Sequence, residues 1–503
     1  MRSSGVSRPT QPLLVSAGQV VDRPADPHAG REPLALMEDA ARRAAEDAGA
    51  SLLAAIDTVA VVNVICHDYG DAPGLLAERL GCRAARTIYT TLGGNTPQSL
   101  VNHLCDEIAA GRSQVALVAG AEAWHTARAL GAAGLTGGWP HRASSTPPWG
   151  DTRPGISEYE ARHGLGQPIV TYPMAENAFR AARGLDLDTH RRELADFAGR
   201  CAAIAARNPY AWFRDGKDAA TLGTVTATNR MVGFPYPKFM NAILDVNQGA
   251  ALLLASDGAA RRLGVAESRW VYPWTGVDVT EHWFFQDRVD YHTLPGVRRA
   301  GAALLETAGI GSGDVRHLDL YSCFPIAPRL SAAMLGIAPD DPRPLTVTGA
   351  LPWFGGPGSN YTTHAIATLM DRLRAEPTSF ALAHALGWHL TKHALAVYAG
   401  TPPPRGWQRA GGSGLQAAVD AERHPAIVEQ ASGRATIETY TVVHGRNGSP
   451  ERAPVIGRLD DGRRFMAVVK GDRGVLEAME RTEQVGRPGR VRSEAGVNRF
   501  DPA

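Results

Sequence analysis

Residues 115–122 of this 503-residue chain read Val-Ala-Leu-Val-Ala-Gly-Ala-Glu, an apolar run that ends in small residues. Such a run predicts a buried strand, and small residues at its end are typical of backbone that closely approaches a helix or a ligand. Similar runs lie at Val59–Ile65, Ala250–Ala255, Leu318–Tyr321 and Phe380–His384. Amphipathic, helix-like stretches lie between them, for example Pro33–Ala48, Ser99–Ala110 and Val297–Thr307. This alternation predicts an α/β fold with buried sheets.

Two changes in composition divide the chain. Residues 125–240 are rich in Gly, Pro, Trp and Arg and carry predicted helices at Glu176–Arg183 and Asp188–Arg207, so we interpret them as an excursion from a core domain. Pro-Pro-Pro at 402–404 and Gly-Gly-Ser-Gly at 411–414 predict a linker. Short β-rich runs with turn-forming residues between them follow at Ala435–Val443, Ala453–Leu459 and Arg464–Lys470. These runs predict a small β-barrel at the C-terminus.

The composition argues against several classes of protein. The formal net charge is +1, with 52 basic and 51 acidic residues, which gives no electrostatic basis for binding nucleic acid or an anionic membrane. No apolar run approaches the ~20 residues of a membrane-spanning helix, and the piece Leu13–Val15 is too short for a signal peptide. The five cysteines form no C-x-x-C pair, so neither a zinc site nor a disulfide framework is expected. We therefore expect a cytoplasmic protein without a metal.

Six stretches of the sequence carry a resemblance to a known family. They are Pro12-Leu-Leu-Val-Ser-Ala-Gly-Gln-Val-Val, Ile108-Ala-Ala-Gly, the run at 115–122, Asp245-Val-Asn-Gln-Gly-Ala-Ala-Leu-Leu-Leu, Tyr321-Ser-Cys-Phe and His384-Ala-Leu-Gly. Their order and spacing resemble the thiolase superfamily, in particular the sterol-carrier-protein-type thiolases and their thiolase-like relatives. The last two stretches resemble that group's His-Asp-Cys-Phe and His-Asn-x-Gly motifs. The resemblance covers roughly residues 12–400.

The resemblance implies a fold and a ligand. It implies two similar β-α-β-α-β-α-β-β halves, at 1–124 with 241–265 and at 266–405, in a five-layer α-β-α-β-α arrangement, with residues 125–240 as a loop domain that covers acyl-CoA. Two central helices then begin at the active site, where their N–H groups stabilise thioester oxyanions. Residues 415–503 resemble the OB-fold modules that accompany such proteins, although no cysteine after Cys323 is present to form their zinc ribbon. The expected ligand is a coenzyme A thioester, with no other cofactor, and the expected state is a monomer or homodimer.

The resemblance also implies that the thiolase nucleophile is absent. Thiolase chemistry needs a cysteine of low pKa at the start of the first central helix. Counting back from Ile108-Ala-Ala-Gly places this position on Gly94, and the family's catalytic histidine aligns with Gly356. The position of a second thiolase cysteine falls near Ala385, and Cys105 lies about three helical turns from Gly94. We therefore expect no acyl-cysteine intermediate.

Several reactive side chains remain at positions that match the family's motifs. Cys323 matches the motif cysteine, which serves as an acid or base in that subgroup, and Tyr321 stands where the motif has histidine. The candidate catalytic residues are Tyr321, Cys323 and His389. The candidate residues for binding the substrate or CoA are Gly94, Asn95, Gly356, Asn360, Tyr361 and His384. A purely structural role in the core stays open for each, and a metal site at His389 and His393 is not expected because no acidic partner lies between them.

Two functions stay open. One is an acyltransferase-family enzyme that acts on an acyl-CoA thioester in lipid metabolism, similar to an acetyl-CoA acetyltransferase but without the acyl-cysteine. Its reaction could also be a retro-aldol cleavage of a carbon–carbon bond, in which Tyr321 moves a hydroxyl proton. The other is a non-catalytic protein that binds or displays a CoA ester.

Overall fold

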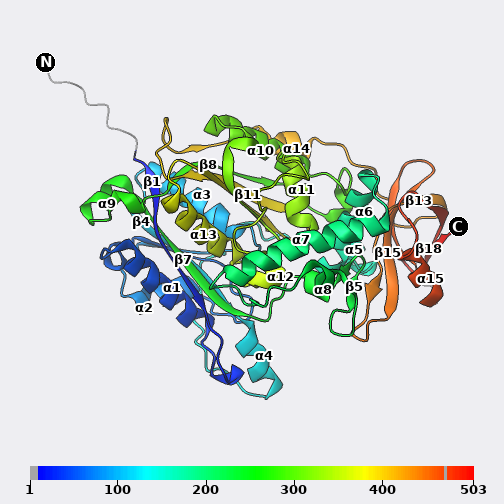
Figure 1. The fold of residues 1–503 in the computed structure, drawn as a ribbon, viewed down its shortest axis with the longest axis horizontal. Coiled ribbons are helices and arrows are strands. Elements are labelled where there is room, and N and C mark those ends of the chain that lie inside the picture. Colours follow the sequence, from blue (N-terminus) through cyan, green and yellow to red (C-terminus); the bar gives the residue numbers. More distant parts are fainter. Residues whose placement is uncertain (1–9, 470–472) are drawn as a thin grey trace.

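The computed structural model describes residues 10–469 and 473–503 (Figure 1). Residues 1–9 of the predicted first half lie outside this range. Residues 470–472 of the predicted C-terminal module also lie outside it, and they include Lys470 at the end of the third predicted C-terminal strand. Within the described residues no helix is long and apolar enough to cross a membrane.

Two five-stranded sheets form the body of the molecule. The first has the order β1-β7-β4-β2-β3, and the second has the order β12-β8-β11-β10-β9. The first sheet consists of β1 (Pro12–Val21), β2 (Thr58–Val61), β3 (Arg86–Tyr89), β4 (Val115–Ala123) and β7 (Asn247–Ser256). The second consists of β8 (Tyr272–Thr280), β9 (Val315–Leu320), β10 (Phe380–Gly387), β11 (Lys392–Ala399) and β12 (Gln408–Arg409). All five apolar runs of the sequence lie in or overlap these strands.

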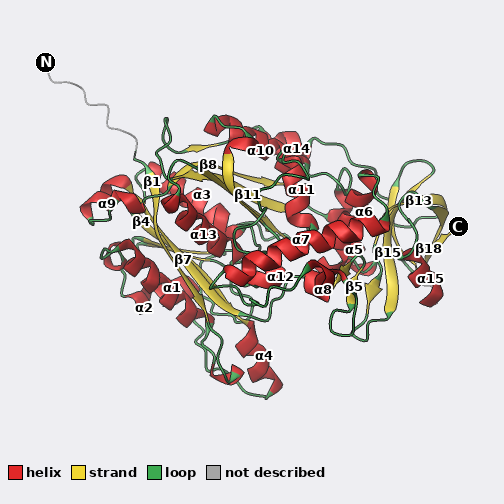
Figure 2. Ribbon diagram, in the orientation of Figure 1, coloured by secondary structure: helices red, strands yellow, loops and turns green. Residues whose placement is uncertain are grey.

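Helices cover both sheets and fill the space between them. The helices of the body are α1 (Pro33–Ala48), α2 (Ala72–Leu80), α3 (Thr96–Ala109), α9 (Asp257–Arg262), α10 (Pro295–Ala308), α11 (Ile326–Met334), α12 (Leu351–Phe354) and α13 (Tyr361–Ala375). Both α3 and α13 contact strands of the two sheets, whereas α1 and α2 pack on the first sheet and α10 and α11 on the second. Figure 2 shows the resulting layers. The predicted α-β-α-β-α arrangement is confirmed.

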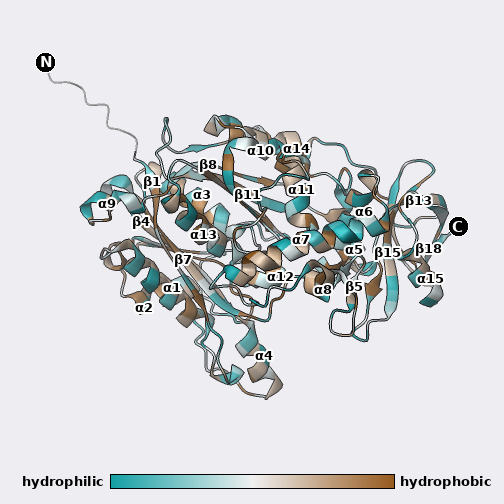
Figure 3. Cartoon of the chain, in the orientation of Figure 1, coloured by the Kyte–Doolittle hydropathy of each residue, from teal (hydrophilic) through white to brown (hydrophobic). Residues whose placement is uncertain are grey.

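Burial follows the hydropathy of the sequence. The strands β4 and β7 are buried along their whole length, and Figure 3 shows apolar colouring along the inner strands and polar colouring on the outer surfaces of the helices. Both central helices are buried on most of their residues, as expected for helices packed between two sheets.

The two halves differ in one strand. In the first half β2 is flanked by β3 and β4, but in the second half β9 lies at the sheet edge and pairs only with β10. The chain from 342 to 350, which lies between α11 and α12, forms a loop instead of an edge strand. The two-residue strand β12 adds to the opposite edge, beside β8.

The segment that ends at Gly150 pairs with the chain at the end of β3, through a single bridge between Thr90 and Trp149. The Trp149 N–H donates to the Tyr89 carbonyl oxygen (2.7 Å), and the Thr91 N–H donates to the Trp149 carbonyl oxygen (2.9 Å). An uncovered edge strand is a ready template for pairing with another chain. Here the chain itself occupies only the end of that edge, next to Thr90.

Most of the excursion between β4 and β7 forms a helical layer beside the second half, whereas its first helix contacts β7 of the first half (Figure 1). Its elements are α4 (Trp124–Ala132), α5 (Glu158–Arg162), α6 (Pro168–Ala182), α7 (Leu187–Arg207), α8 (Ala219–Gly223), β5 (Met231–Gly233) and β6 (Tyr236–Pro237). Figure 1 shows α6 and β5 next to the C-terminal strands, so this layer lies between the body and the C-terminal region.

The C-terminal region contains a closed five-stranded barrel, as the sequence predicts. Its elements are α14 (Leu415–Asp420), β13 (Gly433–Tyr440), β14 (Val443–His444), β15 (Pro450–Leu459), β16 (Arg464–Val469), α15 (Arg473–Met479), β17 (Pro488–Glu494) and β18 (Val497–Pro502). The order β13-β17-β18-β16-β15 closes because β15 pairs back with β13. The sheet also continues through β14 to β5 of the excursion.

Hydrogen bonds from a buried arginine attach the barrel to the body. The Arg464 side chain is fully buried and donates to both carboxylate oxygens of Glu438 (2.6 and 2.9 Å). It also donates to the carbonyl oxygens of Gln286, Arg288 and Val289, which belong to the second half. The barrel is therefore fixed to the segment that leads from β8 to α10.

Candidate functional site

The two central helices begin next to each other, between the sheets. The Gly93 N–H, just before α3, donates to Ser359 Oγ, just before α13 (3.1 Å). In return, the Thr362 hydroxyl of α13 donates to the Gly94 carbonyl oxygen (3.3 Å). The N–H of Gly94 has no acceptor in the described part of the chain. A free N–H at a helix start is a suitable donor for an oxyanion.

The Tyr321 side chain fills the place that a side chain at position 94 would need. A β-carbon built on Gly94 would overlap the Tyr321 hydroxyl and lie 2.5 Å from the Tyr321 ring and from the Leu386 carbonyl oxygen. The φ angle of Gly94 is not positive, so space and not backbone conformation excludes a larger residue. The tyrosine hydroxyl therefore stands where a nucleophile at the start of α3 would stand.

Tyr321 is held by its backbone and its ring, while its hydroxyl is free. Its N–H donates to the His384 carbonyl oxygen (3.0 Å), and its ring packs edge-on against Tyr361 with centroids 5.4 Å apart. The hydroxyl forms no hydrogen bond with any of the described residues. Burial, with a further contribution from Cys323, raises the pKa of Tyr321 well above its usual value. The hydroxyl is therefore protonated at neutral pH and can donate a hydrogen bond or a proton.

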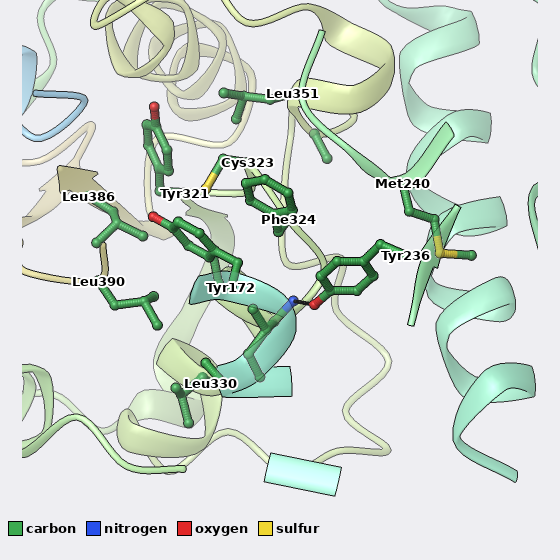
Figure 4. Close-up of a cluster of buried hydrophobic side chains, with 14 of the residues drawn as sticks. Tyr172, Tyr236, Met240, Tyr321, Cys323, Phe324, Leu330, Leu351, Leu386 and Leu390 are labelled. Carbon is green, nitrogen blue, oxygen red and sulfur yellow. Dashed lines mark hydrogen bonds between the residues drawn. The ribbon is translucent and has the colours of Figure 1, made fainter. Parts of the chain in front are cut away.

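Cys323 lies beside Tyr172, a residue of α6 that the sequence did not single out. The Tyr172 ring stacks on Phe324 with centroids 4.6 Å apart, and Figure 4 shows it beside Cys323, Leu386 and Leu390. The Tyr172 hydroxyl donates to the Trp388 carbonyl oxygen (2.8 Å). Burial raises the pKa of Cys323 to about 12, although hydrogen bonding from Tyr172 opposes the shift. Cys323 is therefore a neutral thiol at physiological pH, without the thiolate that a nucleophile requires.

Gly356 and Asn360 both serve the packing of the backbone around the helix starts. The Gly356 N–H donates to the Ile243 carbonyl oxygen (2.8 Å), and a β-carbon at 356 would lie 3.1 Å from that oxygen. The Asn360 amide donates to the Gly120 carbonyl oxygen (2.6 Å) across the interface between the two halves. The small end of the 115–122 run thus accommodates Asn360, since a β-carbon on Gly120 would collide with it.

Tyr361 belongs to a buried polar network. Its hydroxyl lies 2.5 Å from Thr348 Oγ1 and 3.4 Å from the Asp319 carboxylate. That carboxylate also accepts hydrogen bonds from the Thr346 hydroxyl (2.9 Å) and the Val347 N–H (3.0 Å). Burial raises the pKa of Asp319 to about 7. The Tyr361 hydroxyl is therefore engaged with the loop at 342–350, unlike the hydroxyl of Tyr321.

The candidate histidines are neutral and paired within the protein. His389 Nδ1 is 2.7 Å from the Thr171 hydroxyl, and burial lowers the pKa of His389 to about 4. His384 Nε2 is 3.0 Å from His393 Nδ1, and burial lowers the pKa of His384 to about 3. A protonated His389 therefore does not assist Tyr321 at neutral pH.

Arg288 holds the loop that carries His389. Trp388 and Leu390, on either side of His389, have positive φ angles of 58° and 60°. The buried Arg288 guanidinium donates to the carbonyl oxygens of His389 (3.0 Å) and Leu390 (2.6 Å). Nothing in the sequence pattern distinguishes this arginine from the many others, so only the structure identifies it.

Two comparisons show the family of this chain, one over its C-terminal region and one over almost its whole length. A family model described as the thiolase-like protein type 1 additional C-terminal domain matches residues 414–495. The crystal structure of a monomeric SCP2-thiolase-like protein type 1 from Mycobacterium smegmatis is 35% identical to this chain, with a TM-score of 0.85, and the match covers 98% of this chain and 99% of that chain. This chain belongs to the SCP2-thiolase-like protein type 1 family.

More distant structures share the thiolase fold with this type 1 family member. An Ltp2-ChsH2(DUF35) aldolase has a TM-score of 0.59 and 16% identity, over 78% of this chain and 98% of that chain. The dimeric peroxisomal thiolase of Saccharomyces cerevisiae has a TM-score of 0.56 and 14% identity, over 78% and 98% of the two chains. At such identities these matches show the fold alone. The comparison with curated proteins returned no match.

Proposed function

We propose that this protein binds an acyl-CoA thioester at the starts of α3 and α13 and acts on it without an acyl-cysteine intermediate. One observation carries the proposal: the Tyr321 hydroxyl occupies the space of a side chain at Gly94 and has no partner of its own. A protonated hydroxyl beside the free Gly94 N–H forms a pair of donors for a thioester oxygen. Such donors stabilise the negative charge that develops on that oxygen in an enolate or tetrahedral intermediate.

The proposed chemistry is proton transfer or carbon–carbon cleavage rather than thiolysis. An aldolase that shares the fold supports this choice. In such a cleavage Tyr321 would give its proton to the enolate carbon released by the broken carbon–carbon bond and regain one from the substrate hydroxyl, whose oxygen becomes a carbonyl. The neutral Cys323 and Tyr172 would shape the wall of the acyl site. Isothermal titration calorimetry with acetyl-CoA and longer acyl-CoAs tests the binding step. Absence of both heat and a thermal shift at millimolar ligand would refute the proposal.

A second candidate is a protein that binds a CoA ester without turnover. The observation that favours it is the lack of a base among the candidate residues, since Cys323 has a pKa of about 12 and His389 and His384 have pKa values of about 4 and 3. General bases work best with a pKa near the operating pH. Calorimetric binding together with unchanged acyl-CoA after prolonged incubation, followed by mass spectrometry, would favour this candidate.

We further propose that the protein is a monomer. The segment that ends at Gly150 pairs with the end of the β3 edge, at Tyr89 and Thr91, and the related Mycobacterium smegmatis protein is described as monomeric. Multi-angle light scattering at micromolar concentration would show a mass near 53.5 kDa. A mass near twice this value would contradict the proposal.

A further inference from the structure

Lysine is rare in this chain, and one lysine is buried beside the start of α3. Only four of the 52 basic residues counted as Lys or Arg are lysines: Lys217, Lys238, Lys392 and Lys470. Lys392 is 5% exposed, whereas Lys238 is exposed. Arginine cannot lose its proton in a protein, but a buried lysine can. A buried lysine in an arginine-rich chain therefore offers chemistry that its other cations lack.

Two glycines create the space that Lys392 occupies. A β-carbon on Gly93 would lie 2.7 Å from Lys392 Nζ, and a β-carbon on Gly387 would lie 3.0 Å from Lys392 Cε. The ammonium donates to the Leu92 carbonyl oxygen (2.6 Å) and lies 5.4 Å from the centre of the Trp388 ring. Tyr321 lies against Gly94, the next residue of the chain. Lys392 and Tyr321 therefore lie against two successive residues, Gly93 and Gly94.

The Lys392 amine has few partners for its charge. None of the described carboxylates lies within ion-pair distance of it, and Leu92 supplies the one acceptor among the described residues. Next to it, Asn95 Oδ1 is buried without a hydrogen-bond partner and would lie 2.5 Å from the same β-carbon on Gly93. This oxygen is an unused acceptor for an N–H or O–H group that forms beside the amine.

Lys392 also lines a cavity of about 360 Å³. Thr91, Asn95, Ser99, Asp151, Asp278 and Arg409 are among the other lining residues. Burial lowers the pKa of Lys392 to about 8, although the negative charge of Asp151 opposes the shift. Asp278 is already engaged, because it accepts from Ser99 (2.5 Å) and from Arg409 (2.7 Å). His103 and His393 also line the cavity, and burial lowers the pKa of both, so neither competes as a cation at neutral pH.

We propose that Lys392 is a carbonyl-reactive amine that condenses with a small aldehyde or ketone in this cavity. The lone pair of the neutral amine attacks the carbonyl carbon, and a carbon–nitrogen bond forms. The carbonyl oxygen then leaves as water, which takes both hydrogens of the amine, and an imine remains. Asn95 Oδ1 can accept a hydrogen bond from the hydroxyl of the intermediate carbinolamine. The proposal does not require CoA binding.

Reductive trapping tests this directly on the full-length protein. The protein is incubated with propanal and sodium cyanoborohydride at pH 7.5, and each modified lysine is located and timed by peptide mass spectrometry. The reductant adds hydride to the imine carbon and leaves a stable secondary amine. At this pH about a quarter of a lysine with a pKa of about 8 carries a neutral amine, whereas only about 0.1% of a lysine with an ordinary pKa does. We expect Lys392 to be modified at least about tenfold faster than Lys238.

Two variants sharpen the test. Lys392→Arg keeps the charge but cannot form an imine, so the fast modification should vanish, while Lys238→Arg should leave it unchanged. Equal or slower modification of Lys392 than of Lys238 in the wild-type protein overturns the proposal, whether or not Lys392→Arg folds. Fast trapping in a protein that binds no acyl-CoA would support this proposal and refute only the proposed function.

Discussion

The hydroxyl of Tyr321 and a side chain at residue 94 exclude each other. A β-carbon on Gly94 would overlap that hydroxyl, so the glycine and the tyrosine form one structural unit. A cysteine at position 94, where the resemblance to thiolases places the nucleophile, would therefore require more than a single substitution, because a polar group from the second half fills that space.

We expect the purified protein to show no thiolysis of acetoacetyl-CoA. Neither a cysteine at the start of α3 nor a histidine at 356 is present to form and activate a thiolate. Thiolysis at about 1 s⁻¹ or more, which is within the usual range of enzymes, would contradict the proposed absence of an acyl-cysteine. Iodoacetamide should likewise reveal no hyper-reactive cysteine, since burial raises the pKa of the Cys323 thiol.

Gly94→Cys should destabilise the protein and should not restore thiolysis. Overpacking of a filled core costs about 1–3 kcal/mol, and the new side chain has to displace the Tyr321 ring. Tyr321→Ala should relieve the part of this cost that comes from the tyrosine, while the close contact with the Leu386 carbonyl oxygen remains. The double variant should therefore be less destabilised than the sum of the two single effects, by about 0.5–3 kcal/mol. Urea denaturation of all four proteins measures this coupling.

Gly131→Cys is the matched control for this cycle. A β-carbon on Gly131, in α4, meets no atom within 4 Å. The same substitution there should change the free energy of unfolding by far less than at position 94. Equal costs at the two positions would show that the contact with Tyr321 is not the cause.

Tyr321→Phe should weaken the binding of acyl-CoA by roughly 3- to 10-fold, as expected for the loss of one hydrogen bond. Calorimetry measures the change in Kd. Tyr69→Phe is the control, because this tyrosine lies outside the proposed site and its hydroxyl donates to the Glu32 carboxylate (2.9 Å), so its loss should lower the melting temperature rather than the affinity. An unchanged Kd for Tyr321→Phe would remove Tyr321 from the proposed site.

The layered fold was predictable because local signals agree with it. Five apolar runs and the amphipathic helices mark the strands and helices of the body, and α1 begins and ends at the predicted residues, Pro33 and Ala48. The barrel strands β17 and β18 were not predicted, because Arg490, Arg492 and Glu494 leave β17 without an apolar run. The short strand β12 was also beyond prediction, since only its pairing with β8 makes its two residues a strand.

The candidate site was predictable only where a motif fixed the alignment. The match to the His-Asp-Cys-Phe motif identified Tyr321, and the spacing from Ile108 identified Gly94. Only the structure shows that a side chain at 94 would overlap the Tyr321 hydroxyl. Tyr172 and Arg288 reach the site from segments far away in sequence, so no local pattern marks them. The pKa values of His389 and His384 depend on burial by such distant segments and could not be read from the sequence.

The stability of the protein should depend on the ionisation of Asp319. Burial raises its pKa to about 7 in the folded state, above an unfolded value near ~3.9. The folded state therefore holds the proton more tightly, and this contribution to stability is lost as the pH rises from about 4 to about 7. Asp319→Asn, which cannot ionise, should melt at a higher temperature than the wild type at pH 8, and the difference should shrink towards pH 4.5.

Asp341→Asn provides a control of opposite sign. The hydrogen bonds from Arg343 lower the pKa of Asp341, so the ionised form favours the folded state. This variant should melt below the wild type at pH 8, and the difference should shrink only as the pH falls through the lowered pKa. If Asp319→Asn also melts below the wild type at pH 8, the Asp319 carboxylate is stabilised by its hydrogen bonds and the predicted sign is wrong.

Arg464 should couple the barrel to the loop at 388–391. It donates to the carbonyl oxygen of Arg288, and the Arg288 side chain in turn donates to His389 and Leu390. Arg464→Met leaves three carbonyl oxygens of the body without this donor, while Glu438 keeps its pairing with Arg458 (3.0 Å), so it should cost about 1–3 kcal/mol. Hydrogen exchange of residues 388–391 should become faster as well, since the support for two residues with positive φ is weakened.

A variant of the neighbouring Arg463 is the control for the general effect of losing an arginine. Its side chain is 51% exposed and pairs with Asp461 within the same turn, so Arg463→Met should change the stability by less than about 1 kcal/mol and leave exchange at 388–391 as it is. The double variant Arg464→Met with Glu438→Gln also removes the carboxylate that pairs with Arg458, so it should be no more stable than Arg464→Met. It should not restore slow exchange, because the hydrogen bond to the Arg288 carbonyl oxygen is still missing. If Arg464→Met loses stability while exchange at 388–391 stays at the wild-type rate, the barrel is attached to the body but does not support the loop that carries His389.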